Sequence, residues 1–291
     1  MPIYSNTYRE YDGRPRRWFR WLVVVEQELK TLAKFRVFKM LYLLAFLHII
    51  VRMLQVVAYD VMAQDPNNPL QMLLSNLDII EINARTFFSF LYTQTSLMFI
   101  LLLYSGAGMI CNDTRNNLME VYFSKPLTWK DYVIGKILSL VFLGLSITAV
   151  PGVLLVLFHN LLLPGLETFQ ASWWWPLSIT GYSLAIVLPT ALSILACSAL
   201  LPSQNYATIT IIMALVANTS LAGLLAGLLR QRDYLGVSFP LALRRIGEYL
   251  FNENRILFSL SWHWCLLYVV VVSLCALAVV LRKVRREEIA S

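Results

Sequence analysis

Six apolar runs of membrane-spanning length follow one another along this chain of 291 residues. A helix needs about 20 apolar residues to cross the hydrocarbon core of a bilayer. Lipid also forces every backbone polar group to bond within its own helix or barrel. The sequence therefore predicts an all-α polytopic membrane protein, with residues 1–291 forming one transmembrane domain. The expected spans are residues 38–58, 87–110, 134–158, 173–201, 206–229 and 257–280.

The composition agrees with a membrane protein and argues against an enzyme. Hydrophobic residues make up 58% of the chain and charged residues 14%, whereas a soluble domain has about 45–50% and about 25%. The sequence contains no phosphate-binding G-x-x-x-x-G-K-[ST] motif and no H-E-x-x-H zinc motif. The four cysteines form no C-x-x-C pair. We therefore expect no catalytic site, no metal and no cofactor bound by this chain.

The net charge of +7 is read as a signal of orientation, with no nucleic acid expected as a partner. Every lysine lies in the N-terminal segment, between spans two and three, at the start of span three or in the C-terminal tail. Positive residues concentrate in cytoplasmic loops. We therefore expect a multi-pass protein of the cell (inner) membrane with both termini in the cytoplasm.

Two amphipathic segments outside the spans are expected to lie along the membrane. Residues 14–36 place tryptophans and leucines at helical spacing behind a group of arginines, which is typical of an interfacial helix. The alternative is a simple lead-in to span one. Residues 236–254 form an external amphipathic or re-entrant segment, in which Arg244 and Arg245 either attract an anion or anchor the helix at lipid phosphates. Its apolar stripe comprises Phe239, Leu243, Ile246 and Leu250.

A polar segment after span two, residues 113–126, carries an ordered set of helix signals. Asn117 and Glu120 have capping-box spacing, and Pro126 ends the helix because proline has no N–H to donate. The segment therefore predicts a short amphipathic helix on the membrane face. The alternative is an ordinary loop whose charges only fix the topology. The apolar face of the helix consists of Leu118, Val121 and Tyr122.

The order of residues around this segment has a counterpart in a known family. An acidic residue is followed by L-x-E, by Pro-Leu-Thr and by Gly-Lys; these are Asp113, Leu118, Glu120, Pro126, Leu127, Thr128, Gly135 and Lys136. This order resembles the permease subunits of type-2 ABC transporters, and with the span layout the resemblance covers nearly the whole chain. The family often has Gly-Thr before the Leu-Glu pair, where this chain has Asn116 and Asn117.

The resemblance implies a transport subunit that works with a separate ATPase. The short helix would be the coupling helix, which sits in a cleft of a cytoplasmic ABC ATPase, and residues 14–36 would be the elbow helix. ATP and Mg²⁺ would bind to that partner ATPase. A second permease copy or a related permease, surrounding membrane lipids and an export function are also implied. The expected coupling residues are Asp113, Arg115, Leu118, Glu120 and Tyr122.

Polar side chains inside the spans leave two interpretations open. His48 and Arg52 lie one turn apart in span one and form either a packed polar pair or a proton relay, with Asp78 or Glu81 as a partner for the arginine. The polar clusters of spans two and five either line a transport pathway or bond helices together. The candidate pathway residues are Thr93, Gln94, Asn218 and Thr219.

Small residues and prolines predict the packing of the spans. Small-xxx-small spacing predicts close helix packing at 222–227, and small residues at 105–108 predict it near the end of span two. Pro151 and Pro189 predict kinks in spans three and four.

Two other functions compete with the ATP-driven permease. A secondary transporter would use His48 and Arg52 and should show inverted repeats, which the loop lengths do not suggest. A non-transporting scaffold would bind a partner through residues 113–126.

Overall fold

The computed structural model describes residues 19–63, 82–123, 127–162, 170, 172–253 and 257–290. Within these ranges the regular elements are helices, and no strand occurs. The expected all-α polytopic fold is therefore confirmed. The expected partners Asp78 and Glu81 lie outside the described residues.

Six helices or helix pairs in the described part are long and apolar enough to cross a membrane. This number equals the number of apolar runs in the sequence and gives the chain a multi-pass membrane architecture. They are α2 (Arg36–Ala63), α4 (Ala84–Gly106) continued by α5 (Cys111–Arg115), α7 (Trp129–Ile147) continued by α8 (Ala149–Leu162), α10 (Trp175–Leu200), α11 (Gln204–Leu228) and α13 (Trp262–Ala290).

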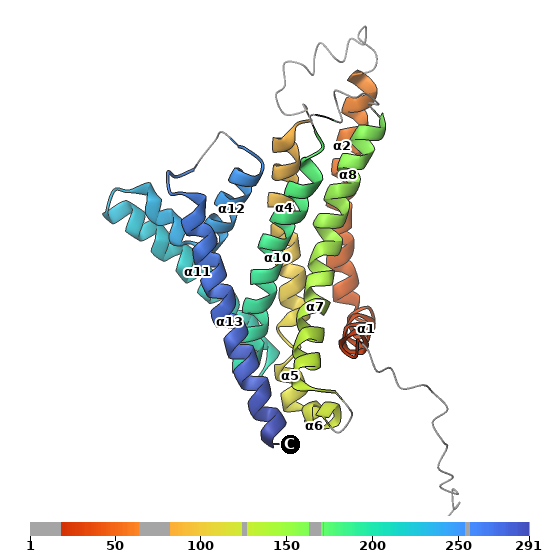
Figure 1. Ribbon diagram of the computed structural model, residues 1–291, viewed down its shortest axis with the longest axis vertical. Coiled ribbons are helices and arrows are strands. Elements are labelled where there is room, and N and C mark those ends of the chain that lie inside the picture. Colours follow the sequence, from red (N-terminus) through yellow and green to blue (C-terminus); the bar gives the residue numbers. More distant parts are fainter. Residues whose placement is uncertain are drawn as a thin grey trace, which may run out of the picture.

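The remaining elements lie at the two ends of the bundle (Figure 1). α1 (Trp21–Leu32) runs across the bundle beside α7, and α6 (Leu118–Phe123) lies near the C-terminal end of α13. The 3₁₀ helix η1 (Arg232–Val237) and α12 (Phe239–Leu250) lie at the opposite end. We call these the α6 end and the α12 end.

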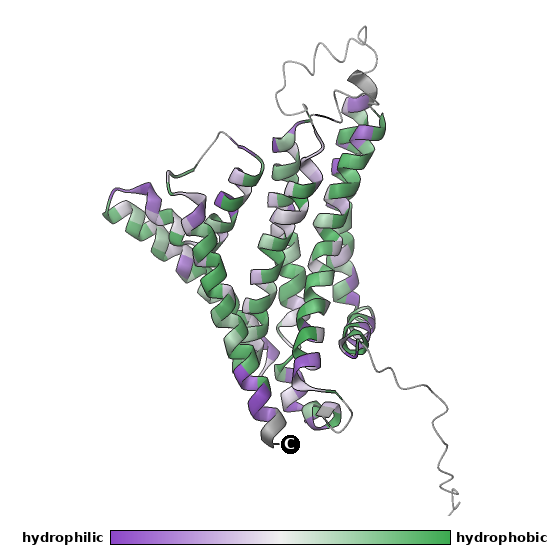
Figure 2. Ribbon diagram, in the orientation of Figure 1, coloured by the Kyte–Doolittle hydropathy of each residue, from purple (hydrophilic) through white to green (hydrophobic). Residues whose placement is uncertain are grey.

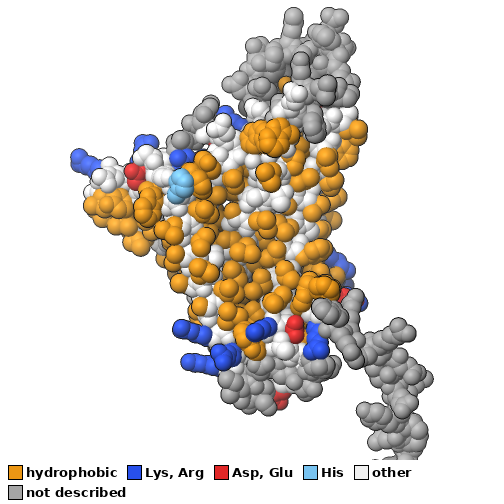
Figure 3. Space-filling view, viewed as in Figure 1, with side chains coloured by type: hydrophobic (Ala, Val, Ile, Leu, Met, Phe, Trp, Pro, Cys, Tyr) orange, Lys and Arg blue, Asp and Glu red, His pale blue; other side chains and the backbone are white. Residues whose placement is uncertain are grey.

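Hydropathy divides the bundle into a broad apolar middle and polar ends (Figure 2). The space-filling view shows the same division on its surface, with apolar side chains over the middle and lysines and arginines grouped at the α6 end (Figure 3). This is the distribution that a membrane selects.

α10 forms the centre of the bundle, packed between α4, α7 and α13. Glycines allow its close contacts: a Cβ on Gly106 would lie 2.8 Å from Ile194, and a Cβ on Gly144 would lie 2.6 Å from Val187. The close packing expected near Gly106 is thus confirmed. At Gly223 and Gly227 of α11, in contrast, a Cβ would meet nothing within 4 Å.

The third membrane segment breaks at Thr148, between α7 and α8. Pro151 explains the break, because it has no N–H for the carbonyl of Ile147 four residues earlier. The side chain of Gln94 supplies the missing donor and bonds that carbonyl at 2.9 Å. The kink expected at Pro151 therefore appears as an interrupted helix, whereas α10 continues through Pro189.

α12 buries the apolar stripe expected in residues 236–254. Leu243 and Ile246 are buried in a cluster with α13. Arg244 and Arg245, expected either to anchor the helix at lipid phosphates or to attract an anion, both pair with the buried Glu248 of the same helix. Its carboxylate lies 3.0 Å from Arg244 Nε and 3.5 Å from Arg245 Nη1.

Candidate functional site

The chain turns twice at the α6 end, once before α5 and once between α5 and α6. Asn117, at the second turn, has φ of 53°, in the left-handed region where asparagine is enriched. Its N–H donates to the Thr114 carbonyl at 3.3 Å, so Asn117 ends α5. The expected capping box with Glu120 is wrong, because an N-cap residue needs an extended backbone. A capping box forms instead between Thr128 and Asp131, at the start of α7.

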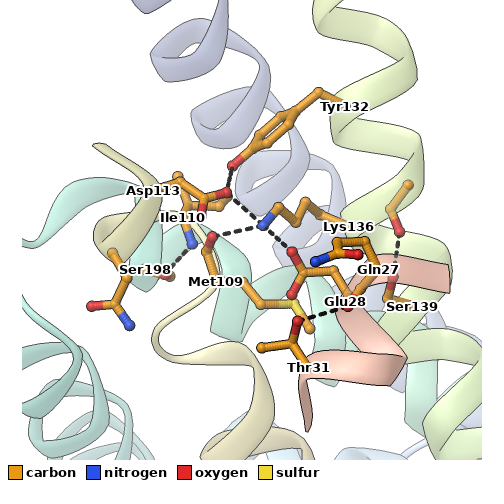
Figure 4. Close-up of polar contacts among 12 residues, drawn as sticks. Gln27, Glu28, Thr31, Met109, Ile110, Asp113, Tyr132, Lys136, Ser139 and Ser198 are labelled. Atoms are coloured by element: carbon orange, nitrogen blue, oxygen red, sulfur yellow. Dashed lines mark hydrogen bonds and ion pairs between the residues drawn. The ribbon is translucent and has the colours of Figure 1, made fainter. Parts of the chain in front are cut away.

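One buried lysine joins three elements at the α6 end (Figure 4). Lys136 of α7 is 1% exposed, and its Nζ lies 2.6 Å from Glu28 Oε1 of α1 and 2.6 Å from Asp113 Oδ2 of α5. The same Nζ donates to the Met109 carbonyl at 3.0 Å. The Tyr132 hydroxyl donates to Asp113 at 2.8 Å. We call Glu28, Asp113, Tyr132 and Lys136 the Lys136 cluster.

The Lys136 cluster stabilises the packing of α1, α5 and α7 against one another. An ammonium group has three protons to donate, and all three find an acceptor here: two carboxylates and a backbone carbonyl. Removing one partner of a buried ion pair costs about 3–5 kcal/mol, because the other charge stays buried. α1, α5 and α7 are therefore held in one arrangement.

Ser198 of α10 holds the first turn of α5. Its hydroxyl accepts the N–H groups of Ile110 at 3.0 Å and Cys111 at 3.2 Å, which belong to the first-turn donors that lack a partner inside a helix. Lys136 takes the carbonyl of Met109, one residue earlier. The connection between α4 and α5 is thus bonded from α10 and from α7 (Figure 4).

Gly135 brings α1 within reach of Lys136. A Cβ on Gly135 would lie 2.6 Å from the Val24 Cβ and 3.1 Å from the Trp21 carbonyl oxygen. The Gly-Lys pair noted in the sequence is therefore a close helix contact followed by an ion pair. Glu28 was missed in the sequence analysis. Its signal is a position one turn after the buried Val24, on the face of α1 that packs against α7.

α6 exposes apolar side chains while one of its residues is fixed inside the protein. Leu118 is 39% exposed and Val121 is 53% exposed, whereas Met119 is buried. The ring of Tyr122 packs 5.5 Å from that of Tyr132. Burial raises the pKa of the Tyr122 phenol, so that this group stays neutral. The result is a docked helix with an uncovered apolar face.

The expected coupling residues divide into exposed and internal ones. Arg115 and Glu120 are exposed beside the apolar face of α6. Asp113 is bound within the Lys136 cluster, so the expectation that it contacts another protein is corrected to an internal role. Pro126 lies outside the described residues.

His48 and Arg52 bond other residues rather than each other within the described part of the chain. His48 Nδ1 lies 2.6 Å from Gln94 Oε1, an oxygen that only accepts, so the imidazole N–H is the donor. Arg52 donates to Gln55 at 2.8 Å and to Ser89 at 3.3 Å. The expected pair is therefore two separate polar contacts on α2.

On α4 the expected pathway residues serve mainly as bonds. Gln94 is fully buried and bonds the carbonyls of Ala45 and Ile147, which ties α4 to α2 and α7. The Thr93 hydroxyl donates to the Ser89 carbonyl of its own helix at 3.1 Å. For Gln94 the pathway interpretation is wrong, because its side chain is enclosed by these helices.

On α11 the expected pathway residues hold the end of η1 and the start of α12. Asn218 accepts the Phe239 N–H at 2.7 Å and donates to the Val237 carbonyl at 3.1 Å. The hydroxyls of Thr219 and Ser238 lie 3.2 Å apart. Both residues therefore bond α11 to the segment that follows it.

A cavity of about 300 Å³ lies between α4, α10, α11 and α12. This volume is at the lower limit of small-molecule pockets, about 300–1,000 Å³. Thr95 and Ser96, from the polar cluster of span two, are among its lining residues. Most of the other lining residues are aromatic or aliphatic, including Tyr92, Phe99, Tyr182 and Leu243.

A buried carboxylate lies near the end of α2, two residues beyond the expected end of span one at residue 58. Asp60 is fully buried, and both of its oxygens lie near Nδ1 of His159 in α8, at 2.9 Å and 3.0 Å. The imidazole stacks on Trp175, with ring centroids 5.8 Å apart. The expected end of span one at residue 58 is therefore too early, because α2 extends to Ala63.

Comparisons with protein-family models and with curated proteins found no match for this chain.

Proposed function

We propose that this chain is the membrane-spanning permease subunit of an ATP-driven transporter of the type-2 ABC class. The observation that carries the proposal is α6: a short helix with an uncovered apolar face, joined to the bundle through the Lys136 cluster. Exposed apolar patches mark contact sites for a protein or a membrane, and we assign this one to a protein. In this proposal α6 binds a cytoplasmic ABC ATPase, which places the α6 end and both termini in the cytoplasm.

The Lys136 cluster supplies a physical route for coupling. A displacement of α6 acts on α5, which contains Asp113, and through the Asp113–Lys136 ion pair on α7. α5 also continues α4, so the same displacement reaches a second membrane helix. In this scheme Asp113 is a positioning residue. Leu118, Glu120 and Tyr122 remain the proposed contacts to the ATPase.

The proposal assigns the remaining partners as follows. ATP and Mg²⁺ bind to the ATPase and no cofactor binds to this chain. A second permease, identical or related, covers α2 and α11, whose apolar windows are only 11% buried. Membrane lipids surround the rest, and export is the direction that the resemblance favours.

The proposal is tested by purifying the tagged chain from its native membrane and assaying ATPase activity. The unchanged protein should bring down a cytoplasmic ATPase. The variant Leu118→Ser/Glu120→Ala should recover at least tenfold less activity while keeping the same thermal stability, because both side chains are exposed.

A matched control makes two similar changes, from an aliphatic residue to Ser and from Glu to Ala, on another exposed helix face at the α6 end. Val23→Ser/Glu26→Ala alters exposed residues of α1 and should leave ATPase recovery unchanged. Equal recovery from both variants would remove α6 as the coupling site. If the tagged chain purifies without any ATPase activity, the proposal is rejected.

A second candidate function rests on the Asp60–His159 pair. A buried carboxylate with an imidazole partner in membrane helices is the kind of group that carries protons in transporters. The chain would then be a proton-coupled secondary transporter. Vesicles containing this chain alone, given a pH gradient and candidate substrates, should show proton movement that Asp60→Asn abolishes. Without proton movement in either protein, this candidate is rejected.

A further inference from the structure

A different cavity, of about 350 Å³, lies at the α6 end of the bundle between α5, α10 and α13. It faces away from the Lys136 cluster. Thr114 and Arg115 of α5 line it, together with Lys283 of α13, whereas Asp113 points to Lys136. We call it the Arg115 cavity.

The Arg115 cavity lies at the level where membrane helices end. Arg115 and Leu200 are the last residues of two candidate spans, and Lys283 is in the last turn of a third, which ends at Glu287. Side chains at this depth meet lipid headgroups in a bilayer. The cavity is therefore within reach of a lipid in the leaflet at the α6 end.

Two cationic side chains give the Arg115 cavity its charge. Arg115 is exposed and makes no ion pair with another residue in the described ranges. Lys283 pairs with Glu287 at 2.7 Å. Exposed arginines at 282, 285 and 286 surround Lys283 on α13. An arginine and a lysine that line one cavity suit a phosphate group, since guanidinium matches its oxygens and both carry positive charge.

Thr114, which lines the same cavity, has a buried hydroxyl. Its Oγ1 has no hydrogen-bond partner among the described residues. A buried polar group left unsatisfied destabilises a protein by about 1–3 kcal/mol. A phosphate oxygen that displaces the groups covering this hydroxyl would accept its proton. This hydroxyl is the observation, independent of the charges, that points to a ligand.

The opposite wall of the Arg115 cavity is apolar. Leu200, Leu201 and Pro202 line it, and Leu200 is 65% exposed. A free phosphate would leave these side chains uncovered. A phospholipid would cover them with its glycerol and acyl chains while its phosphate reaches the cations.

We propose that the Arg115 cavity binds the phosphate headgroup of an anionic phospholipid from the leaflet at the α6 end. The headgroup bridges Arg115 on α5 and Lys283 on α13 and accepts a hydrogen bond from Thr114. The bound lipid thereby links α13 to the helix that immediately precedes α6. The proposal assigns Arg115 to a lipid rather than to the ATPase, and it does not depend on the ATPase.

The test is lipid binding by the purified full-length chain, measured by native mass spectrometry in detergent. Phosphatidylglycerol is titrated against a background of phosphatidylcholine. The variants Arg115→Gln and Lys283→Gln should each bind phosphatidylglycerol about tenfold more weakly. The control Arg285→Gln removes the same charge from α13 outside the cavity lining and should bind as the unchanged protein does.

Thr114→Val tests the hydroxyl separately. It should weaken phosphatidylglycerol binding and leave thermal stability without that lipid unchanged or higher, because it removes an unsatisfied polar group while keeping the side-chain shape. A stability loss without any change in lipid binding would overturn the role of the hydroxyl.

A competition with inorganic phosphate separates the lipid from a soluble anion. Millimolar phosphate should not displace phosphatidylglycerol if the apolar wall contributes to binding. Full displacement would show a site for a soluble phosphate and overturn the lipid proposal. An equal loss of binding in Arg285→Gln would show general surface charge and overturn it as well.

Discussion

α10 and α11 are consecutive helices with nearly the same hydropathy and opposite surroundings. Their most apolar windows have mean hydropathies of 2.1 and 2.0, yet 67% of the first is buried inside the protein and only 11% of the second. α10 lies between other helices, whereas α11 leans away from the bundle with η1 beside it (Figure 1). Hydropathy therefore reports the membrane and says nothing about which neighbours a helix has.

The difference lies in small and polar residues. Lipid is as apolar as leucine, so helices in a membrane associate through close packing and hydrogen bonds. Around α10, Gly106 and Gly144 admit its side chains, and its Ser198 bonds the backbone of α5. On α11, Gly223 and Gly227 have the same residue type but nothing near them. A small residue therefore permits a close helix contact but does not show that another helix lies beside it.

The largest effect is expected in the Lys136 cluster, where the helices pack closely against one another. Lys136→Met leaves the buried Asp113 and the partly buried Glu28 without their cation, and the free energy of unfolding should fall by about 3–5 kcal/mol. Unfolding in mixed detergent measures this. Lys130→Met, at an exposed lysine of the same helix, is the control and should stay near the unchanged protein. Equal stability of both variants would contradict a stabilising role for the Lys136 cluster.

Neutralising the partners as well sharpens the same experiment. In the triple variant Glu28→Gln/Asp113→Asn/Lys136→Met no charge remains in the Lys136 cluster, so much of the lost stability should return. A triple variant as unstable as Lys136→Met alone would mean that the cluster stabilises by packing rather than by charge.

The next effect tests the close contact between α7 and α10. Gly144→Ala adds a Cβ 2.6 Å from a methyl group of Val187, and such overpacking should destabilise the protein by about 1–3 kcal/mol. Val187→Ala in the same chain makes room and should restore part of the loss. A double variant that is no better than Gly144→Ala would show that the contact is not the cause.

A smaller effect is expected where α4 bonds the broken third segment. Gln94→Leu removes the donor that satisfies the Ile147 carbonyl, and a side-chain hydrogen bond in a membrane contributes about 0.6–1.7 kcal/mol. Thr93→Val, which removes a hydroxyl bonded within its own helix, serves as the control and should change stability less. Equal losses in the two variants would remove the special role of Gln94. Thermal unfolding compares them.

The smallest effect is expected on α11, whose apolar surface is mostly exposed in the isolated chain. Gly223→Ala and Gly227→Ala add a methyl group where nothing lies within 4 Å. Because alanine is the better helix former, the isolated chain should be unchanged or up to about 1 kcal/mol more stable. A clear destabilisation would mean that α11 is covered and would break the comparison with α10. Light scattering on the same samples reports whether a second chain packs there.

The sequence was sufficient to predict the elements, and insufficient for most of their contacts. Length and apolar runs predicted the membrane helices, and spacing predicted α6 and the buried stripe of α12. The partners of Lys136 could not be predicted, because Glu28 lies 108 residues away and only the fold brings it near. The link between Gln94 and Pro151 is similar. Gln94 bonds the Ile147 carbonyl, which Pro151 leaves without a backbone donor, and this bond depends on the position of α4 against α7.

Charges at the ends of spans were the least predictable from the sequence. Asp60 lies two residues beyond the expected end of span one at residue 58. In the structure its helix continues and His159 satisfies the carboxylate. The sequence predicts that Arg244 and Arg245 face lipid or an anion. Their pairing with Glu248 could not be predicted, because the burial of Glu248 depends on the tertiary fold.

The Lys136 cluster also sets an order of events while the chain is being made. Glu28 and Asp113 both precede Lys136 in the sequence, so both carboxylates have left the ribosome before the lysine emerges. Glu248, in contrast, finds Arg244 and Arg245 within its own helix and is paired as soon as α12 forms. α1 crosses no membrane, yet it must be in place before the third span can settle with its charge neutralised.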